Sequence, residues 1–178
     1  NVVANLGTSL TDRQILILNQ FFDDIIICFD GDESGYKAAL RAAENSIKEL
    51  QPEKQISFLF LPDGEDPDSY VNKNGKVNFI DFTKQAKISI HQFIFNHYKQ
   101  QTDNNPSSMA VFEKKLRSIA GTIRDDFIKK YVLEFFLEKI STLTPHSNIG
   151  RKQFYKKKIK SLQSTQKYFN ESKSLSGV

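Results

Sequence analysis

The chain has 178 residues, of which 25 are Lys or Arg and 21 are Asp or Glu, so its formal net charge is +4. This length allows one large domain or two small ones. A composition of 39% hydrophobic and 26% charged residues is typical of a soluble globular protein. No apolar run is long enough to cross a bilayer, so we expect no membrane contact. The single cysteine, Cys28, excludes an internal disulfide and argues against a cysteine-built metal site.

The modest net charge conceals a strong asymmetry along the chain. Residues 1–85 carry 14 acidic and 8 basic side chains, whereas residues 86–178 carry 7 acidic and 17 basic ones. Such an asymmetry suggests that the two halves have different functions and that the basic half binds a polyanion. Lysine-rich helices with solvated faces would produce the same pattern.

The first half alternates short apolar runs with helical patterns. We expect strands over residues 1–6, 25–29 and 55–61, and the continuous apolar run 25–29 predicts a strand buried on both faces. Helices are expected after an N-cap at Thr8, Ser9 or Thr11, from Ser34 or Gly35, and from Pro67. Strands separated by helices predict an α/β fold with a mostly parallel sheet.

The second half shows no strand pattern. Apolar spacing predicts helices over residues 88–101, 109–119 and 125–140, which form a small antiparallel bundle. Residues 151–178 are rich in Lys and Ser. We therefore expect an α/β domain over residues 1–85, a helical bundle over 86–150, and a basic helix and linker over 151–178.

The strongest local feature is the sequence Phe29-Asp30-Gly31-Asp32, which ends the second expected strand. Two carboxylates two positions apart project to the same side. Mg²⁺ prefers such hard oxygen ligands, usually one or two carboxylates together with substrate phosphates. Asp-Gly-Asp is also ordinary turn chemistry, so the pair by itself does not decide between a metal site and a turn.

A second acidic segment, residues 63–69, ends the next strand, and parallel topology brings it to the same edge of the sheet. Asp66 is also a helix N-cap candidate, with Asp68 and Ser69 in the first turn. Six acids at one edge repel one another strongly unless a cation is present. The two segments together predict a divalent-metal site suited to phosphoryl transfer.

These motifs resemble the bacterial replicative DNA primases, which synthesise RNA primers. The matching stretches are residues 2–8 (VVANLGT), residues 28–32 (CFDGD) with Gly35, Lys37, Ala38 and Ala39, and residues 60–71 (FLPDGEDPDSYV). The resemblance covers residues 1 to about 85 closely and implies the later part of a Toprim fold, a Rossmann-like domain shared with topoisomerases. The second half resembles the family only in being helical, since the Toprim domain of these proteins is followed by a helical bundle.

The resemblance implies that Asp30 and Asp32 hold Mg²⁺ or Mn²⁺, with Asp66 and Asp68 completing the acidic site. These metals would bind the triphosphate of an incoming ribonucleotide while the primer 3′-oxygen attacks its α-phosphate and pyrophosphate leaves. Nucleotide contacts would come from three further residues: Gly31, Lys37 and Glu65.

The resemblance also implies partners: a single-stranded DNA template, ribonucleoside triphosphates, the RNA primer and, through a C-terminal domain, the replicative helicase. It implies a location in the bacterial cytoplasm. Zinc belongs only to an N-terminal domain of the family that this sequence does not contain.

The chain departs from the family pattern in two ways. Nothing before Asn1 supplies the strand that ends in the family's catalytic Glu, so we expect this chain to be inactive by itself and to expose a hydrophobic edge of its sheet. Where many relatives have a basic residue after Asp-Gly-Asp, this sequence has Glu33, which puts a phosphate contact there in doubt.

Other interpretations remain open. Another Toprim enzyme, a type IA topoisomerase or a nuclease, shares Asp-x-Asp but not the Gly-Glu-Asp-Pro-Asp-Ser run. A noncatalytic module whose basic helices bind a helicase or nucleic acid would show no dependence on divalent metals. The segment Lys156-Lys157-Lys158, which has aromatic neighbours, fits nucleic-acid binding, but a linker to another domain is favoured because the run is rich in Lys and Ser.

Overall fold

The computed structural model describes residues 10–143. Its elements in chain order are α1 (Asp12–Phe21), β1 (Asp24–Phe29), α2 (Glu33–Ser46), the 3-10 helix η1 (Ile47–Glu49), β2 (Gln55–Phe60), α3 (Pro67–Ala86), β3 (Ile88–Ser89), α4 (Ile90–Gln100), α5 (Pro106–Gly121) and α6 (Asp126–Leu143). By its contacts the chain divides into a unit of residues Asn1–Phe136 and a unit of Leu137–Val178. The sheet and α1 to α5 belong to the first unit, and the domain limits expected from the sequence stay predictions.

The three strands form one sheet in the order β1-β2-β3. β1 and β2 run parallel, in register from Asp24 opposite Gln55 to Phe29 opposite Phe60. β3 is antiparallel to β2 and pairs only through Ile88 and Ser89. This arrangement confirms the α/β class with a parallel β1–β2 pair. The prediction that the second half contains no strand was wrong, because a two-residue strand is too short to show a period in the sequence.

The helices begin where side chains can cap them. The Thr11 side chain accepts a hydrogen bond from the Gln14 backbone N–H, and the Gln14 side chain accepts one from the Thr11 N–H. This capping box confirms the predicted start of α1. Pro67 occupies the first turn of α3, as predicted. α2 begins at Glu33, earlier than predicted, because Asp32 caps it.

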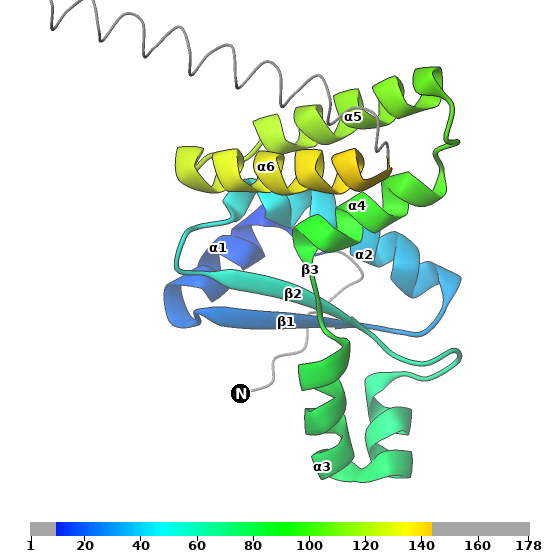
Figure 1. Cartoon of the computed structure of the whole chain (residues 1–178). Coiled ribbons are helices and arrows are strands. Elements are labelled where there is room, and N and C mark those ends of the chain that lie inside the picture. The colour runs from blue at the N-terminus through cyan, green and yellow to red at the C-terminus, as the bar shows by residue number, and fades with distance from the viewer. Residues whose placement is uncertain (1–9, 144–178) are drawn as a thin grey trace, which may run out of the picture. The chain divides into compact units, whose positions relative to one another are not determined.

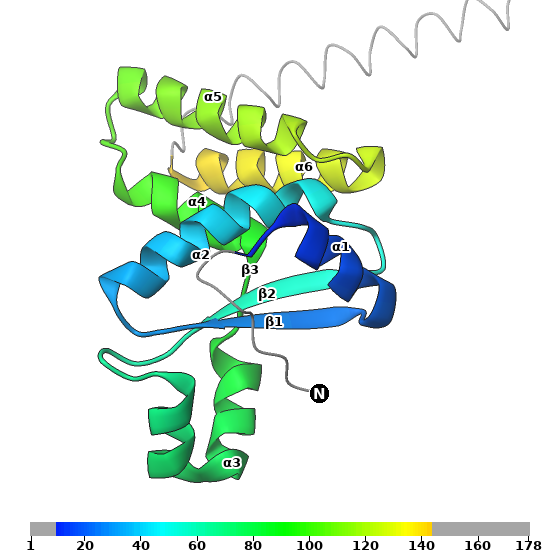
Figure 2. The same ribbon diagram turned by 180° about the vertical axis from the view of Figure 1, so that it is seen from behind.

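Helices α1, α2 and α4 lie on the same side of the sheet, and α3 extends from the other side (Figures 1 and 2). Under the three helices lies an aromatic cluster. The Phe29 ring is 5.1 Å from Phe58 and 5.6 Å from Phe60, measured between centroids. The Phe93 ring of α4 stacks on Phe60 at 5.3 Å. Phe58 is fully buried, so this cluster is the core that joins the sheet to α4.

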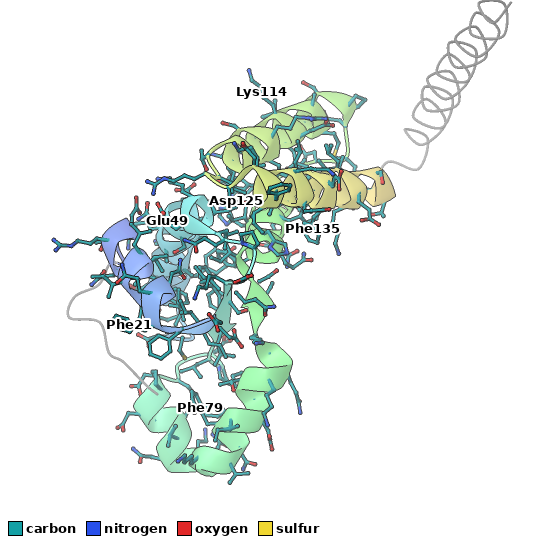
Figure 3. All side chains as sticks on the ribbon, turned by 90° about the vertical axis from the view of Figure 1, so that its left-hand side faces the viewer. Phe21, Glu49, Phe79, Lys114, Asp125 and Phe135 are labelled. Atoms are coloured by element: carbon teal, nitrogen blue, oxygen red, sulfur yellow. The ribbon has the colours of Figure 1, made fainter. Side chains whose placement is uncertain are left out.

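The prediction that residues 25–29 are buried on both faces was wrong for the described part of the chain. Ile26 is 39% exposed, and Ile17 and Phe21 of the neighbouring α1 are also exposed; Figure 3 shows Phe21 at the end of α1. The physical reason is that successive side chains of a strand point to opposite faces, and helices α1, α2 and α4 cover only the face on which Ile25 and Phe29 are buried (Figure 1).

The three helices predicted for the second half are present as α4, α5 and α6. α4 packs on α5 through Phe95 and Phe112, whose ring centroids are 5.4 Å apart. The His91 ring meets Phe135 of α6 edge-on at 4.7 Å, in keeping with a packing role. Among residues 10–143 no helix is both long and apolar enough to cross a membrane.

α3 is a helical hairpin rather than one straight helix. Gly75 adopts a φ of +81° in its middle, a backbone conformation that favours glycine. The Tyr70 ring on one arm stacks on Phe82 of the other at 5.2 Å, and Phe79 contributes a further contact at 6.0 Å. These rings form a small apolar contact between the arms.

Candidate active site at the carboxyl end of the sheet

Two loops meet at the carboxyl ends of β1 and β2, and they are joined by backbone hydrogen bonds. The Gly31 N–H donates to the Glu65 carbonyl at 3.0 Å, and the Gly64 N–H donates to the Gly31 carbonyl at 2.9 Å. A Cβ atom on Gly31 would lie 1.9 Å from the Pro62 carbonyl oxygen. Only glycine permits this approach, which fixes the Asp30–Asp32 loop against the loop that follows β2.

Asp32 is held by the first turn of α2. Its Oδ1 accepts a hydrogen bond from the Gly35 N–H at 2.6 Å, and its carbonyl accepts one from the Tyr36 N–H at 3.0 Å. A Cβ atom on Gly35 would lie 2.3 Å from the Asp30 carbonyl oxygen, so the first turn of α2 also packs directly against the backbone of Asp30. Asp30 is exposed, and its carboxylate has no hydrogen bond or ion pair within residues 10–143.

Asp66 and Asp68 lie at the start of α3. Asp66 is the N-cap, and its Oδ1 accepts a hydrogen bond from the Ser69 N–H at 2.7 Å. Asp68 accepts one from the side-chain amide of Asn72 at 3.1 Å. The expected capping role of Asp66 is therefore confirmed.

Side chains of the following helix, α3, already offset the negative charge of Glu65. Lys73 Nζ lies 2.8 Å from Glu65 Oε1, and the Ser69 hydroxyl donates to Oε2 at 2.6 Å. The hydrogen bond from Lys73, followed by that from Ser69, lowers the pKa of Glu65. The sequence analysis missed Lys73. The signal was its position eight residues after Glu65, in the second turn of the helix that begins at Pro67.

Lys37, expected to contact nucleotide, pairs with Glu33 at 2.6 Å, and both side chains are exposed. The hydrogen bond from Lys37 lowers the pKa of Glu33. Glu33 stands where many relatives have a basic residue, and it pairs with Lys37, the nearest lysine along α2. Lys156, Lys157 and Lys158 lie outside the described residues.

The carboxylates share one edge of the sheet, but they do not form a closed cage. Within residues 10–143 no three His, Cys, Asp or Glu side chains gather closely enough to hold a metal ion by themselves. The donor chemistry nevertheless fits a hard divalent cation, because within residues 10–143 the Asp30 carboxylate has no partner and Asp32 uses only Oδ1 in a hydrogen bond. Such a cation takes its remaining ligands from water and substrate phosphates.

A cavity of about 410 Å³ lies away from this edge, next to the start of β2. Leu50, Gln55, His91, Ile128 and Phe135 are among the residues that line it. None of the predicted site residues lines this cavity.

The parallel strands with glycine-fixed acidic loops at their carboxyl ends define a Toprim-like domain followed by packed helices. The family model described as Toprim-like matches residues 1–71. Solved structures agree. The chain superposes on a structure of the DnaG catalytic core with a TM-score of 0.72 and 31% identity, over 80% of this chain and 46% of that one. The Escherichia coli primase catalytic core gives 0.70 and 32%, over 76% and 43%.

Curated relatives give the same result. The DNA primase of Haemophilus influenzae is 42% identical over 101 residues, which are 57% of this chain and 17% of that protein. The DNA primase of Rickettsia prowazekii is 35% identical over 157 residues, 83% of this chain and 26% of that protein. The comparisons therefore show that this chain is similar to part of the catalytic core of bacterial DnaG-type DNA primases. The matched part covers only about a sixth to a quarter of the length of these relatives.

Proposed function

We propose that this chain supplies the metal-binding part of a primase polymerase domain, in which Asp30 and Asp32 hold Mg²⁺ or Mn²⁺. The observation that supports this most strongly is the pair of hydrogen bonds through Gly31, which join the two acidic loops at one edge of the sheet. The bound metal would neutralise the triphosphate and stabilise the charge that develops during nucleotidyl transfer.

The chain's own residues prepare this edge. Gly31 lets the two loops approach, and the Gly35 N–H orients the Asp32 carboxylate. Both carboxylate oxygens of Asp30 lack a partner in the described part of the chain, residues 10–143. Lys73 offsets the charge of Glu65, which reduces the repulsion between the acidic side chains. In this proposal Asp66 and Asp68 contribute negative charge to the same edge, and Gly31, Lys37 and Glu65 lie where they can meet the nucleotide.

The wider proposal follows from the family. The whole protein would make short RNA primers from ribonucleoside triphosphates on single-stranded DNA during replication in the bacterial cytoplasm. A relative 31% identical to this chain has been solved as a primase catalytic domain bound to single-stranded DNA. The replicative helicase, zinc in an N-terminal domain, and nucleic-acid contacts through Lys156, Lys157 and Lys158 belong to this proposal as well.

Titration with Mn²⁺ observed by NMR tests the metal site. We expect paramagnetic broadening to begin at the amides of residues 30–32, and Asp30→Asn to weaken it strongly. Asp63→Asn is the matched control, because Asp63 is an exposed acid in the facing loop that the proposal does not use. Absence of broadening at millimolar Mn²⁺, or equal effects of the two substitutions, would contradict the metal site and favour a noncatalytic binding module.

In the full-length protein the same two variants test the activity. We expect Asp30→Asn to abolish template-dependent RNA synthesis, while Asp63→Asn retains most of it. A fully active Asp30→Asn protein would refute the assignment of Asp30.

A further inference from the structure

Helix α2 is fastened to α4 by two hydrogen bonds at opposite ends of one face. The Tyr36 hydroxyl lies 3.0 Å from His97 Nδ1, and the Tyr98 hydroxyl donates to Glu44 Oε1 at 2.9 Å. Tyr36 and Glu44 are eight residues apart, so they lie two turns apart along the same side of α2. All four side chains are partly buried. The two bonds are similar in geometry but differ in their distance from the acidic loops.

The Tyr36 bond is the one close to the candidate site, and its surroundings keep it rigid. The Tyr36 ring lies 5.4 Å from Phe93 and 6.0 Å from Phe60, and it contacts the His97 ring at 5.7 Å. The second ring nitrogen of His97, Nε2, lies 3.0 Å from the side-chain amide of Gln101. Both ring nitrogens of His97 are therefore held, and the imidazole has one defined orientation from which to bind Tyr36.

The backbone at Tyr36 in turn supports both carboxylates. The Tyr36 N–H holds the Asp32 carbonyl, and the Gly35 N–H holds Asp32 Oδ1. Gly35 also lies against the backbone of Asp30, so closely that no side chain fits between them. A small shift of the first turn of α2 would therefore move both Asp30 and Asp32.

We propose that Tyr36 and His97 are positioning residues for the Asp30–Asp32 loop, through which helix α4 of the bundle sets the geometry of the metal site. This inference rests on the proposed function, because it assigns a purpose to the rigid placement of those carboxylates. Neither residue touches the metal or the nucleotide. They act through the first turn of α2. The Glu44–Tyr98 bond fastens the far end of the same helix and has no such role.

The contrast between the two bonds provides a matched experiment on the full chain. Tyr36→Phe and Tyr98→Phe each remove one hydroxyl and keep the ring. We expect both variants to lose similar global stability in urea. Only Tyr36→Phe should speed hydrogen exchange at the Gly35 amide, by about three- to tenfold beyond the global change, and weaken Mn²⁺ binding by a similar factor.

His97→Phe removes the ring nitrogen that bonds to the Tyr36 hydroxyl while keeping a ring for packing. If Tyr36 and His97 act together, the double variant Tyr36→Phe/His97→Phe should exchange its Gly35 amide no faster than the single variant that binds Mn²⁺ more weakly. The inference is overturned if Tyr36→Phe leaves Gly35 exchange unchanged, or if Tyr98→Phe accelerates it equally. Failure of the metal site itself would appear separately, as unaltered spectra of the wild-type chain in Mn²⁺, while exchange at Gly35 still reports on the positioning.

Discussion

Replacing Gly31 by alanine should be the most damaging small substitution at the candidate site. The new Cβ would lie 1.9 Å from the Pro62 carbonyl oxygen and 2.6 Å from the Leu61 carbonyl oxygen, whereas real Cβ contacts essentially never fall below 3.0 Å. Both neighbours are backbone atoms, so no side chain can rotate away. The two loops must therefore separate by roughly an ångström or more.

Such a separation breaks the two hydrogen bonds that Gly31 makes, which are now 3.0 and 2.9 Å long. Their loss costs about 2 kcal/mol, and the overpacking adds about 1–3 kcal/mol. We therefore expect Gly31→Ala to lower the free energy of unfolding by about 3–5 kcal/mol. This is a large fraction of the stability of a typical domain.

Urea denaturation of the 178-residue chain, followed by circular dichroism, measures this effect. Gly121→Ala is the matched control, because Gly121 is the last residue of α5 and nothing lies within 4 Å of a Cβ added there. We expect Gly121→Ala to change stability by less than about 1 kcal/mol. If Gly31→Ala is as mild as its control, the loops are not joined as described, and the argument for a shared acidic edge fails.

Two further predictions concern buried groups. Arg124→Met should destabilise by about 1–3 kcal/mol in urea, because Arg124 lies 2.7 Å from Glu49, whose side chain is 3% exposed and which Figure 3 shows beside α1. Arg117→Met breaks a pair whose carboxylate, Glu113, is 31% exposed, and it should cost less than about 0.5 kcal/mol. Equal losses would contradict the role of burial of the carboxylate. Burial, followed by the charge of Asp30, raises the pKa of the Cys28 thiol to about 11. The folded chain should therefore be alkylated slowly at pH 8 and faster with Asp30→Asn, and a thiol that titrates near 9 in the folded chain would refute this.

Much of the local structure was readable from the sequence. Thr11 and Pro67 marked helix starts because capping and a fixed proline φ are properties of a few consecutive residues. The strand ends before Asp30 and Pro62 were visible as changes from apolar to polar residues. Asp30 and Asp32 could be named as candidates for the same reason, since two carboxylates around a glycine are a local pattern.

The partners of those residues could not be read in the same way. That Gly31 must be glycine depends on the Pro62 carbonyl, 31 residues further along the chain. That Glu65 is paired, while Asp30 has no partner among residues 10–143, depends on which lysine lies within reach after α3 has formed. The exposure of Ile26 depends on which face of the sheet the helices cover, and an apolar run by itself cannot show that.

The sequence by itself determined the class of fold, the order of most elements, the two acidic loops and the family they resemble, because each depends on short-range patterns. Only the tertiary structure decided how the loops are joined, which acids are already neutralised, and that Tyr36 and His97, 61 residues apart, meet beneath the site. The physical reason is that hydrogen bonds and ion pairs form between side chains brought together by packing, and packing depends on the whole chain. The six acids of this edge are therefore not equivalent. Asp32, Asp66 and Asp68 accept hydrogen bonds and Glu65 pairs with Lys73, whereas within residues 10–143 the Asp30 carboxylate has no such partner.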